Sequence, residues 1–194
     1  QLHASNQSVT FPGDVIAAKQ NGCERIILEQ FYSPCDGSVI ATSAGDITLG
    51  NVTANFDVTA TFQDVPGSTI TYTPPAGTTQ VIYEFNWQES YLDNHVNTSM
   101  RLYLDSDEVV KRRRVLNVQQ YGDGHYTYKH GFNIGGSADT DVGRVASWSS
   151  GKVIKLQTRS YDANYQSRMH RLNSWDGGGS TQVIVPCLGI TAIG

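Results

Sequence analysis

The chain has 194 residues, of which 39% are hydrophobic and 16% are charged, and its formal net charge at pH 7 is -4. This length and apolar content suit a single domain with a sizeable core and argue against disorder of the whole chain. The negative charge argues against a nucleic-acid partner, and no apolar run is long enough for membrane insertion. Low charge with abundant Gly, Ser, Thr, Asn and Tyr is typical of extracellular and virion-surface β proteins.

Residues 1–50 differ from the rest, and we interpret them as an N-terminal lead-in or small subdomain ahead of a head domain at residues 51–194. Within them, Glu24–Tyr32 fits a short helix and a strand equally well, because a short apolar run has no decisive periodicity. Ser33–Gly37 then ends this element. A start at Gln1 rather than Met suggests a fragment or a processed product.

From Asn51 onward, residue alternation and β-branched side chains recur and predict a series of short strands. The predicted strands are Phe56–Phe62, Ser68–Thr73, Gln80–Trp87, Met100–Leu104, Val109–Val118, His125–Phe132, Val142–Trp148, Lys152–Tyr161, Arg168–Asn173 and Thr181–Ile193. Turn sequences such as Asp64–Gly67 and Pro74–Gly77 separate them. Strands and turns without intervening helices predict an all-β protein, a jelly-roll-like antiparallel β-sandwich.

The order of three of these signals resembles a known family. They are Thr69–Pro75 followed by Thr79–Phe85, the run Met100–Val109, and Lys152–Tyr161 followed by a variable loop and Gln182–Ile193. In this order the chain is similar to the trimeric C1q/TNF-like jelly-roll heads of fibre and spike proteins from phages and large algal viruses. The resemblance runs from Asn51 to Ile193, and the first fifty residues have no clear place in it.

The resemblance implies a homotrimer at the virion surface, or otherwise outside cells, that binds a host surface glycan or protein. It implies no catalysis and no cofactor. A virion protein without host-binding activity, such as a structural capsid decoration protein, is an alternative.

Aromatic and polar residues gather in four loops, which we predict to contact the receptor. Tyr and Trp rings pack on the apolar faces of sugars, while acids and amides bind hydroxyl groups. The predicted ligand-binding residues are Tyr91, Asp93, His95, Tyr121, Asp123, His125, Tyr165, Trp175 and Asp176. The same composition is also explained if the polar residues form turns and the aromatic residues are partly buried or contact a neighbouring protomer.

The run His125–His130 is the best candidate for catalysis. On a strand, Tyr128 and His130 share one face, and Tyr/His pairs serve as acid and base in sandwich-fold polysaccharide lyases. Arg159 would then neutralise a uronate. A jelly-roll lyase that uses Tyr128, His130 and Arg159 is therefore an alternative function, although tyrosine is also favoured on half-buried strands.

Two charged clusters have both functional and structural interpretations. Lys111–Arg114, expected on a strand, could bind a sulfated or carboxylated glycan, or could guard an exposed strand edge. Asp105, Asp107 and Glu108 could bind calcium, but a solvated hairpin turn explains them as well, and we expect no metal site.

Three cysteines, Cys23, Cys35 and Cys187, contain no C-x-x-C pair, which argues against a zinc ribbon. Cys187 lies in the last apolar strand and is expected to be a buried thiol. Cys23 and Cys35 could pair under oxidising conditions.

Overall fold

The structure, a computed structural model, describes residues 25–92, 96–118, 122–172 and 182–194. These residues form mainly short strands: β1 (Ile27–Pro34), β2 (Val39–Thr42), β3 (Gly45–Thr48), β4 (Phe56–Asp57), β5 (Gln63–Asp64), β6 (Ile70–Tyr72), β7 (Gln80–Tyr91), β8 (Val96–Leu104), β9 (Asp107–Glu108), β10 (Arg114–Val118), β11 (Asp123–Asn133), β12 (Lys152–Ser160), β13 (Ser167–Met169), β14 (Arg171–Leu172), β15 (Gln182–Val183) and β16 (Cys187–Ile193). Two 3₁₀ helices, η1 (Val110–Arg112) and η2 (Thr140–Val142), connect strands. Within the described ranges, no helix is long and apolar enough to cross a membrane.

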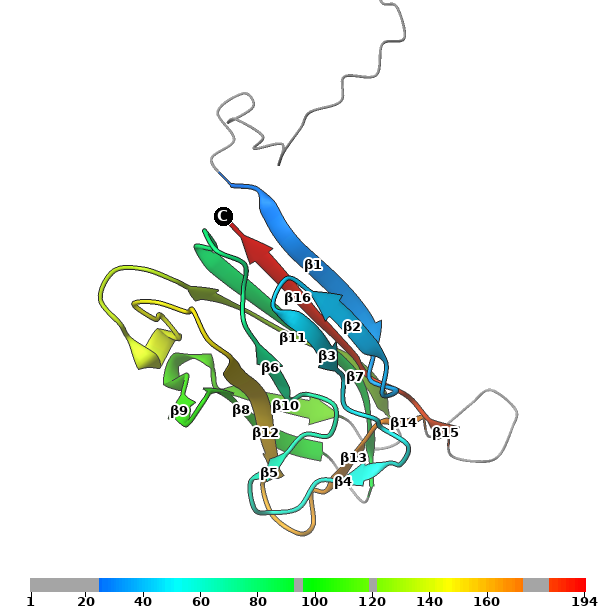
Figure 1. Cartoon of the computed structure of the whole chain (residues 1–194). Helices are drawn as coiled ribbons and strands as arrows, with labels where there is room; N and C mark the ends of the chain where they lie inside the picture. The colour runs from blue at the N-terminus through cyan, green and yellow to red at the C-terminus, as the bar shows by residue number, and fades with distance from the viewer. Residues whose placement is uncertain (1–24, 93–95, 119–121, 173–181) are drawn as a thin grey trace, which may run out of the picture.

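Eight of the described strands pair in a nested order (Figure 1). The first pairs with the last, β1 with β16, and the inner pairs are β6 with β12, β7 with β11, and β8 with β10. Two further antiparallel pairings, β16 with β7 and β12 with β8, join these pairs into two sheets. Sheet 1 has the order β1-β16-β7-β11 and sheet 2 the order β6-β12-β8-β10. This nesting is the strand order of a jelly roll, so the predicted jelly-roll-like sandwich is confirmed.

The core lies between the two sheets and is rich in aromatic rings. Alternate residues of β7, namely Tyr83, Phe85 and Trp87, point inward and are at most 2% exposed, because successive side chains of a strand face opposite sides. The rings of Phe85 and Trp87 stack with their centroids 5.7 Å apart. They share one buried cluster with aliphatic side chains of sheet 2 such as Leu102 and Leu156. The opposite face of each sheet is left as an outer surface.

The two ends of the described chain meet at one end of the sandwich, which we call the base. Ile26 and Gly194 exchange backbone hydrogen bonds of 3.2 and 2.9 Å, and Ile193 pairs with Gln80 at the start of β7. The strand β7 runs from the base to the opposite end of the sandwich, where Tyr91 pairs with Ser167. We call this opposite end, formed by residues 90–92, 122–125 and 161–167, the loop end. In Figure 1 the C-terminus lies toward the top and the 161–166 connection at the bottom.

The ambiguous run Glu24–Tyr32 is a strand from residue 27 onward, not a helix. It forms β1, which pairs with β16 over most of its length, from Ile27 opposite Ile193 to Pro34 opposite Cys187. The boundary predicted at residue 50 therefore does not divide the described residues into two domains, because β1, which begins at residue 27, is an edge strand of sheet 1. Residues 1–24, which include Cys23, lie outside the described residues.

Several predicted strands differ in extent from the observed ones. The strand predicted at 109–118 begins only with β10, and the one predicted at 168–173 breaks at His170, where φ is 60°, between β13 and β14. The strand predicted at 181–193 is divided into β15 and β16.

No strand forms at 142–148, where one was predicted. The chain there has the end of the 3₁₀ helix η2 and isolated β-bridges, because Gly143 adopts a left-handed φ of 73° that turns the chain after η2. The strand predicted at 56–62 is limited to β4. Beyond it, the Thr59 backbone N–H and hydroxyl both donate to the Gln63 amide oxygen, at 3.2 and 2.9 Å, and this local turn ends the extended run.

The cysteines occupy different environments. Cys35 is buried, its thiol donates to the Gly67 carbonyl at 3.3 Å, and burial raises its pKa to about 12. Cys187 is half-buried on the outer face of sheet 1, not in the core as predicted, because its neighbours Leu188 and Ile190 take the inward positions.

Candidate functional site

Three connections from distant parts of the sequence meet at the loop end: β7 to β8, β10 to β11, and β12 to β13. Three backbone hydrogen bonds join them: Tyr91 N–H to the Gly122 carbonyl (3.4 Å), Leu92 N–H to the Gln166 carbonyl (3.1 Å) and Tyr161 N–H to the Asn97 carbonyl (2.8 Å). Loops carried on a rigid scaffold are the usual place for recognition residues. The loop end is therefore the first candidate for a binding surface.

The connection at 161–166 presents two tyrosine rings to solvent. Tyr161 is 65% exposed and Tyr165 is 37% exposed, and the rings meet edge to face with their centroids 5.8 Å apart. Asp162 shapes the turn that carries them. Its carboxylate accepts from the Asn164 N–H at 2.7 Å, and its carbonyl accepts from the Ser160 hydroxyl at 2.9 Å. An aspartate that bonds the backbone two residues ahead stabilises a tight turn, so the two rings are held in place.

A buried polar cluster supports the loop end from inside the sandwich. Glu89 is fully buried and accepts from the Trp87 indole N–H at 3.1 Å and from the Thr98 hydroxyl at 2.8 Å. The hydroxyls of Thr98 and Ser167 are 3.1 Å apart and share a hydrogen bond. Burial, together with the negative charge of Glu89, raises the pKa of Tyr126. Because buried polar groups need such partners, the cluster ties β7, β8 and β13 together beneath the loops.

Four of the predicted ligand-binding residues lie in the described part of the chain, and the structure brings them to the loop end. Tyr91 ends β7, Asp123 begins β11, Tyr165 lies in the 161–166 connection, and His125 is exposed on β11. Tyr161 is the more exposed of the two paired rings, although the prediction does not single it out. The other five predicted residues lie outside the described residues: Asp93, His95, Tyr121, Trp175 and Asp176.

The three residues of the lyase alternative do not converge. Tyr128 is fully buried, its hydroxyl donates to the Arg112 carbonyl, and burial raises its pKa to about 12. His130 also points into the core, where burial and the charge of Arg112 lower its pKa to about 4. Arg159 belongs to β12 and lies on the outer face of sheet 2, on the other side of that sheet from both. This geometry offers a substrate no shared acid, base and cation.

The basic run Lys111–Arg114 reaches a strand only at Arg114, the first residue of β10, and does not form one patch. It begins in η1, and its members turn to separate partners. Lys111 lies 3.8 Å from Asp141, Arg113 contacts Glu108 at 2.5 Å, and the Arg114 guanidinium lies 5.0 Å from the Tyr128 ring centre. The predicted anion-binding cluster is thereby divided among internal contacts.

Two of the three acidic residues near the β8–β9 hairpin, Asp105 and Glu108, are also engaged. Asp105 occupies the turn with a φ of 55°, accepts from the Val153 N–H at 2.8 Å and pairs with Lys152 at 2.8 Å. Salt bridges to Arg101 and Arg113 occupy Glu108. The hairpin interpretation therefore accounts for these acids. Across the ranges that the structure describes, no group of three His, Cys, Asp or Glu side chains is placed to hold a metal ion.

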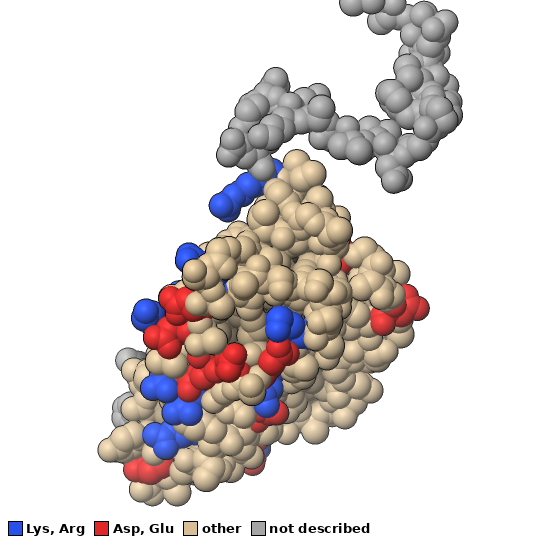
Figure 2. All heavy atoms as spheres, turned by 60° about the vertical axis from the view of Figure 1, so that its left-hand side comes forward, with Lys and Arg blue, Asp and Glu red and all other residues tan. Residues whose placement is uncertain are grey.

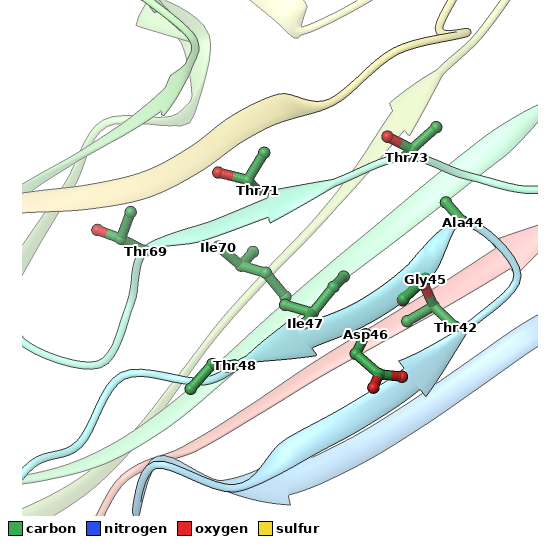
Figure 3. Close-up of a pocket in the computed structure, with 10 residues that line it drawn as sticks. All are labelled: Thr42, Ala44, Gly45, Asp46, Ile47, Thr48, Thr69, Ile70, Thr71 and Thr73. Atoms are coloured by element: carbon green, nitrogen blue, oxygen red, sulfur yellow. The ribbon is translucent and has the colours of Figure 1, made fainter.

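A groove that sequence reasoning missed lies between the β2–β3 hairpin and β6 (Figure 3). In that view the side chains of Ile47 and Ile70 point toward one another, whereas Thr69, Thr71 and Thr73 point away from the hairpin. The groove has a volume of about 460 Å³. Its two sides come from segments more than twenty residues apart, and neither carries a recognisable motif, so no local signal could have revealed it.

The two outer faces differ in charge. Among outward positions of β1, β16, β7 and β11, the charged side chains are Glu84, Lys129 and Asp123, and the first two pair at 2.7 Å. The outer face of sheet 2 instead carries Arg101, Lys155, Arg159 and other charged side chains. Figure 2 brings the left-hand side of Figure 1 forward and shows basic and acidic side chains gathered side by side.

No protein-family model and no curated protein matches this sequence. Among solved structures, the chain is similar to a chain in the structure of infectious bursal disease virus Gx strain, with 11% sequence identity and a TM-score of 0.30. The match covers 80% of this chain and 50% of the other, so this chain spans about half the length of that neighbour. A likeness this slight carries no functional argument.

Proposed function

We propose that the chain is a non-catalytic attachment head that binds a host-surface glycan through its loop end. The observation that carries the proposal is the exposed tyrosine pair Tyr161 and Tyr165, held on an ordered turn where three connections meet. Exposed rings beside polar side chains suit sugars, because the ring packs on C–H faces while polar groups bind hydroxyls. The viral setting comes from the sequence resemblance to fibre and spike heads.

The placement of the chain ends supports an attachment role. Ile26 lies beside Gly194 at the base, and the tyrosine pair lies at the other end of the strands. The described residues therefore begin on the side of the head away from the loop end. A head carried from that side presents its loops outward.

We further propose that three copies pack through the outer face of sheet 1. Along β1, β16, β7 and β11 this face presents mostly uncharged side chains, such as Gln30, Tyr32, Ile82 and Thr191, and depletion of charge is typical of interface centres. The aromatic rings of β7 point into the core, so mainly uncharged polar and aliphatic side chains would form this contact, with Tyr32 of β1 as an exposed aromatic ring among them. Three loop ends side by side would convert weak binding at one head into avidity.

A glycan array probed with the full chain tests the attachment function. Any glycan that binds is then titrated against Tyr161→Ala, which should weaken binding about 2- to 13-fold, since an aromatic contact contributes about 0.5–1.5 kcal/mol. Tyr161→Phe keeps the ring and should retain most of the affinity. Val39→Ala, an exposed truncation on β2, is the control for nonspecific effects. An array without binding, or equal affinity of Tyr161→Ala and the wild type, would count against the loop end.

A further inference from the structure

The ring of Phe62 lies between two arginine side chains on the outer face of sheet 2. The guanidinium carbon of Arg101 is 3.8 Å from the ring centre and that of Arg159 is 5.3 Å from it. Arg101 lies on β8 opposite Gln157, and Arg159 lies on the adjacent β12 opposite Ser99, so the two arginines are diagonal neighbours on one face. Phe62 directly precedes β5, whose pairing with β12 fixes its place over both strands.

The acids around these arginines neutralise them only in part. Glu108 is shared, at 3.5 Å from Arg101 and at 2.5 Å from Arg113, and Asp64 is paired with Lys155 at 3.0 Å. Within the described part of the chain, Arg159 takes part in none of the ion pairs, and the buried Nε of Arg101 has no hydrogen-bond partner. The cluster therefore carries more positive than negative charge.

Two like charges side by side on a sheet destabilise it unless something compensates. Packing against Phe62 supplies part of the compensation, because an aromatic face attracts a guanidinium group. The ring also limits the orientations of both side chains, and among the described residues the Arg101 Nε makes no hydrogen bond and Arg159 makes no ion pair. A planar guanidinium group binds a carboxylate or sulfate through two parallel hydrogen bonds, and a group held in advance loses less entropy on binding.

We propose that Arg101, Arg159 and Phe62 form a subsite for a carboxylate or sulfate group of an acidic glycan. The Ser99 hydroxyl and the amide oxygen of Gln157, whose N–H donates to Asp64 at 2.8 Å, offer partners for sugar hydroxyls. A nucleic acid fits less well, because Asp64 and Glu108 flank the arginines and the chain has a net charge of -4. The subsite adjoins the loop end, because Arg159 lies two residues before Tyr161, and it rests on the proposed function only in treating the ligand as a glycan.

The test is calorimetric titration of the full chain with a heparin hexasaccharide as the sulfated probe and a hexagalacturonate as the carboxylated probe. Arg159→Ala should bind the better of these probes about 10-fold more weakly, the loss expected for a charge-assisted hydrogen-bonded contact. Arg159→Lys keeps the charge but not the planar fork and should recover only part of the affinity. Raising NaCl from about 50 to about 300 mM should weaken wild-type binding through screening.

Arg144→Ala is the matched control, because it removes one exposed positive charge from the connection between η2 and β12. It should bind the probe as the wild type does. The proposal is overturned if neither probe binds, if Arg144→Ala weakens binding as much as Arg159→Ala, or if a short DNA duplex binds through Arg159 as tightly as the glycan. The two proposals can fail independently, because Tyr161→Ala tests the loop end and leaves Phe62, Arg101 and Arg159 in place.

Discussion

Replacing Ile82 with lysine tests whether copies of the chain pack through the outer face of sheet 1. Ile82 is half-buried in this face, between Thr191 on β16 and Gly131 on β11. In an isolated chain a lysine at this position extends into solvent. The free energy of unfolding should then change by no more than about 0.5 kcal/mol, as for other surface substitutions.

In a trimer packed on this face, three lysines would approach one another near the axis. At a separation of about 8 Å and an effective dielectric constant of about 20, each pair repels by about 2 kcal/mol, and the three pairs together by about 6 kcal/mol. Such a penalty shifts the association equilibrium by about four orders of magnitude. The variant should therefore be monomeric at concentrations where the wild type is assembled.

Light scattering on a sizing column measures the outcome. The wild type should have a mass three times the chain mass of 21.2 kDa, and Ile82→Lys should have the chain mass with an unchanged circular dichroism spectrum. Val115→Lys adds the same charge at a position that is 62% exposed on β10 of sheet 2 and should stay trimeric. A monomeric wild type, or a trimeric Ile82→Lys, refutes the proposed packing.

Three further outcomes concern two buried histidines, a strained glycine and the turn at Asp162. Burial lowers the pKa values of His130 and His170 to about 4. As the pH falls, the unfolded chain therefore takes up protons on these histidines before the folded chain does. The free energy of unfolding should be at its full value above about pH 6.5 and should fall toward pH 4 by up to about 3 kcal/mol per histidine. Urea unfolding curves at about pH 7 and about pH 4.5 measure this loss of stability, and the loss should be smaller in His170→Gln. Equal urea midpoints for the wild type at the two pH values would contradict the prediction. Gly67→Ala should lower the free energy of unfolding by about 2–4 kcal/mol, because φ is 80° and the new Cβ would lie 2.9 Å from a valine methyl; an unchanged urea midpoint would show that the site relaxes. Asp162→Ala should speed amide exchange at Asn164 while leaving the urea midpoint unchanged; unaltered exchange would mean that the turn is held by other contacts.

Sequence reasoning succeeds where a strand carries its own pattern. β7 and β12 alternate inward and outward residues over their length, and both were predictable from β-branched and aromatic enrichment. It could not choose between helix and strand for β1, because the deciding factor is the partner β16 at the other end of the chain. It also overextended residues 142–148, where the left-handed backbone at Gly143 outweighs the strand preference of the neighbouring side chains.

The candidate sites were also predictable only where neighbouring residues in the sequence carry the pattern. The tyrosine-rich connection was predictable, because aromatic, acidic and amide residues occur together within five consecutive positions from Tyr161 to Tyr165. The arginine subsite was not, because Phe62, Arg101 and Arg159 are brought together only by the pairing of β12 with β5 and β8. The basic run Lys111–Arg114 illustrates the reverse case, in which adjacent charges in the sequence turn to different partners in the fold.

The jelly-roll topology explains why loops predicted separately lie together. Successive long strands run in opposite directions between the base and the loop end, so the connections between them alternate between the two ends. The connections from β7 to β8, β10 to β11 and β12 to β13 therefore all reach the loop end, whereas those from β6 to β7, β8 to β10 and β11 to β12 reach the base. Three of the four loops that were predicted from their composition are connections at the loop end. A recognition surface assembled in this way can change one loop without altering the strand pairing that positions the others.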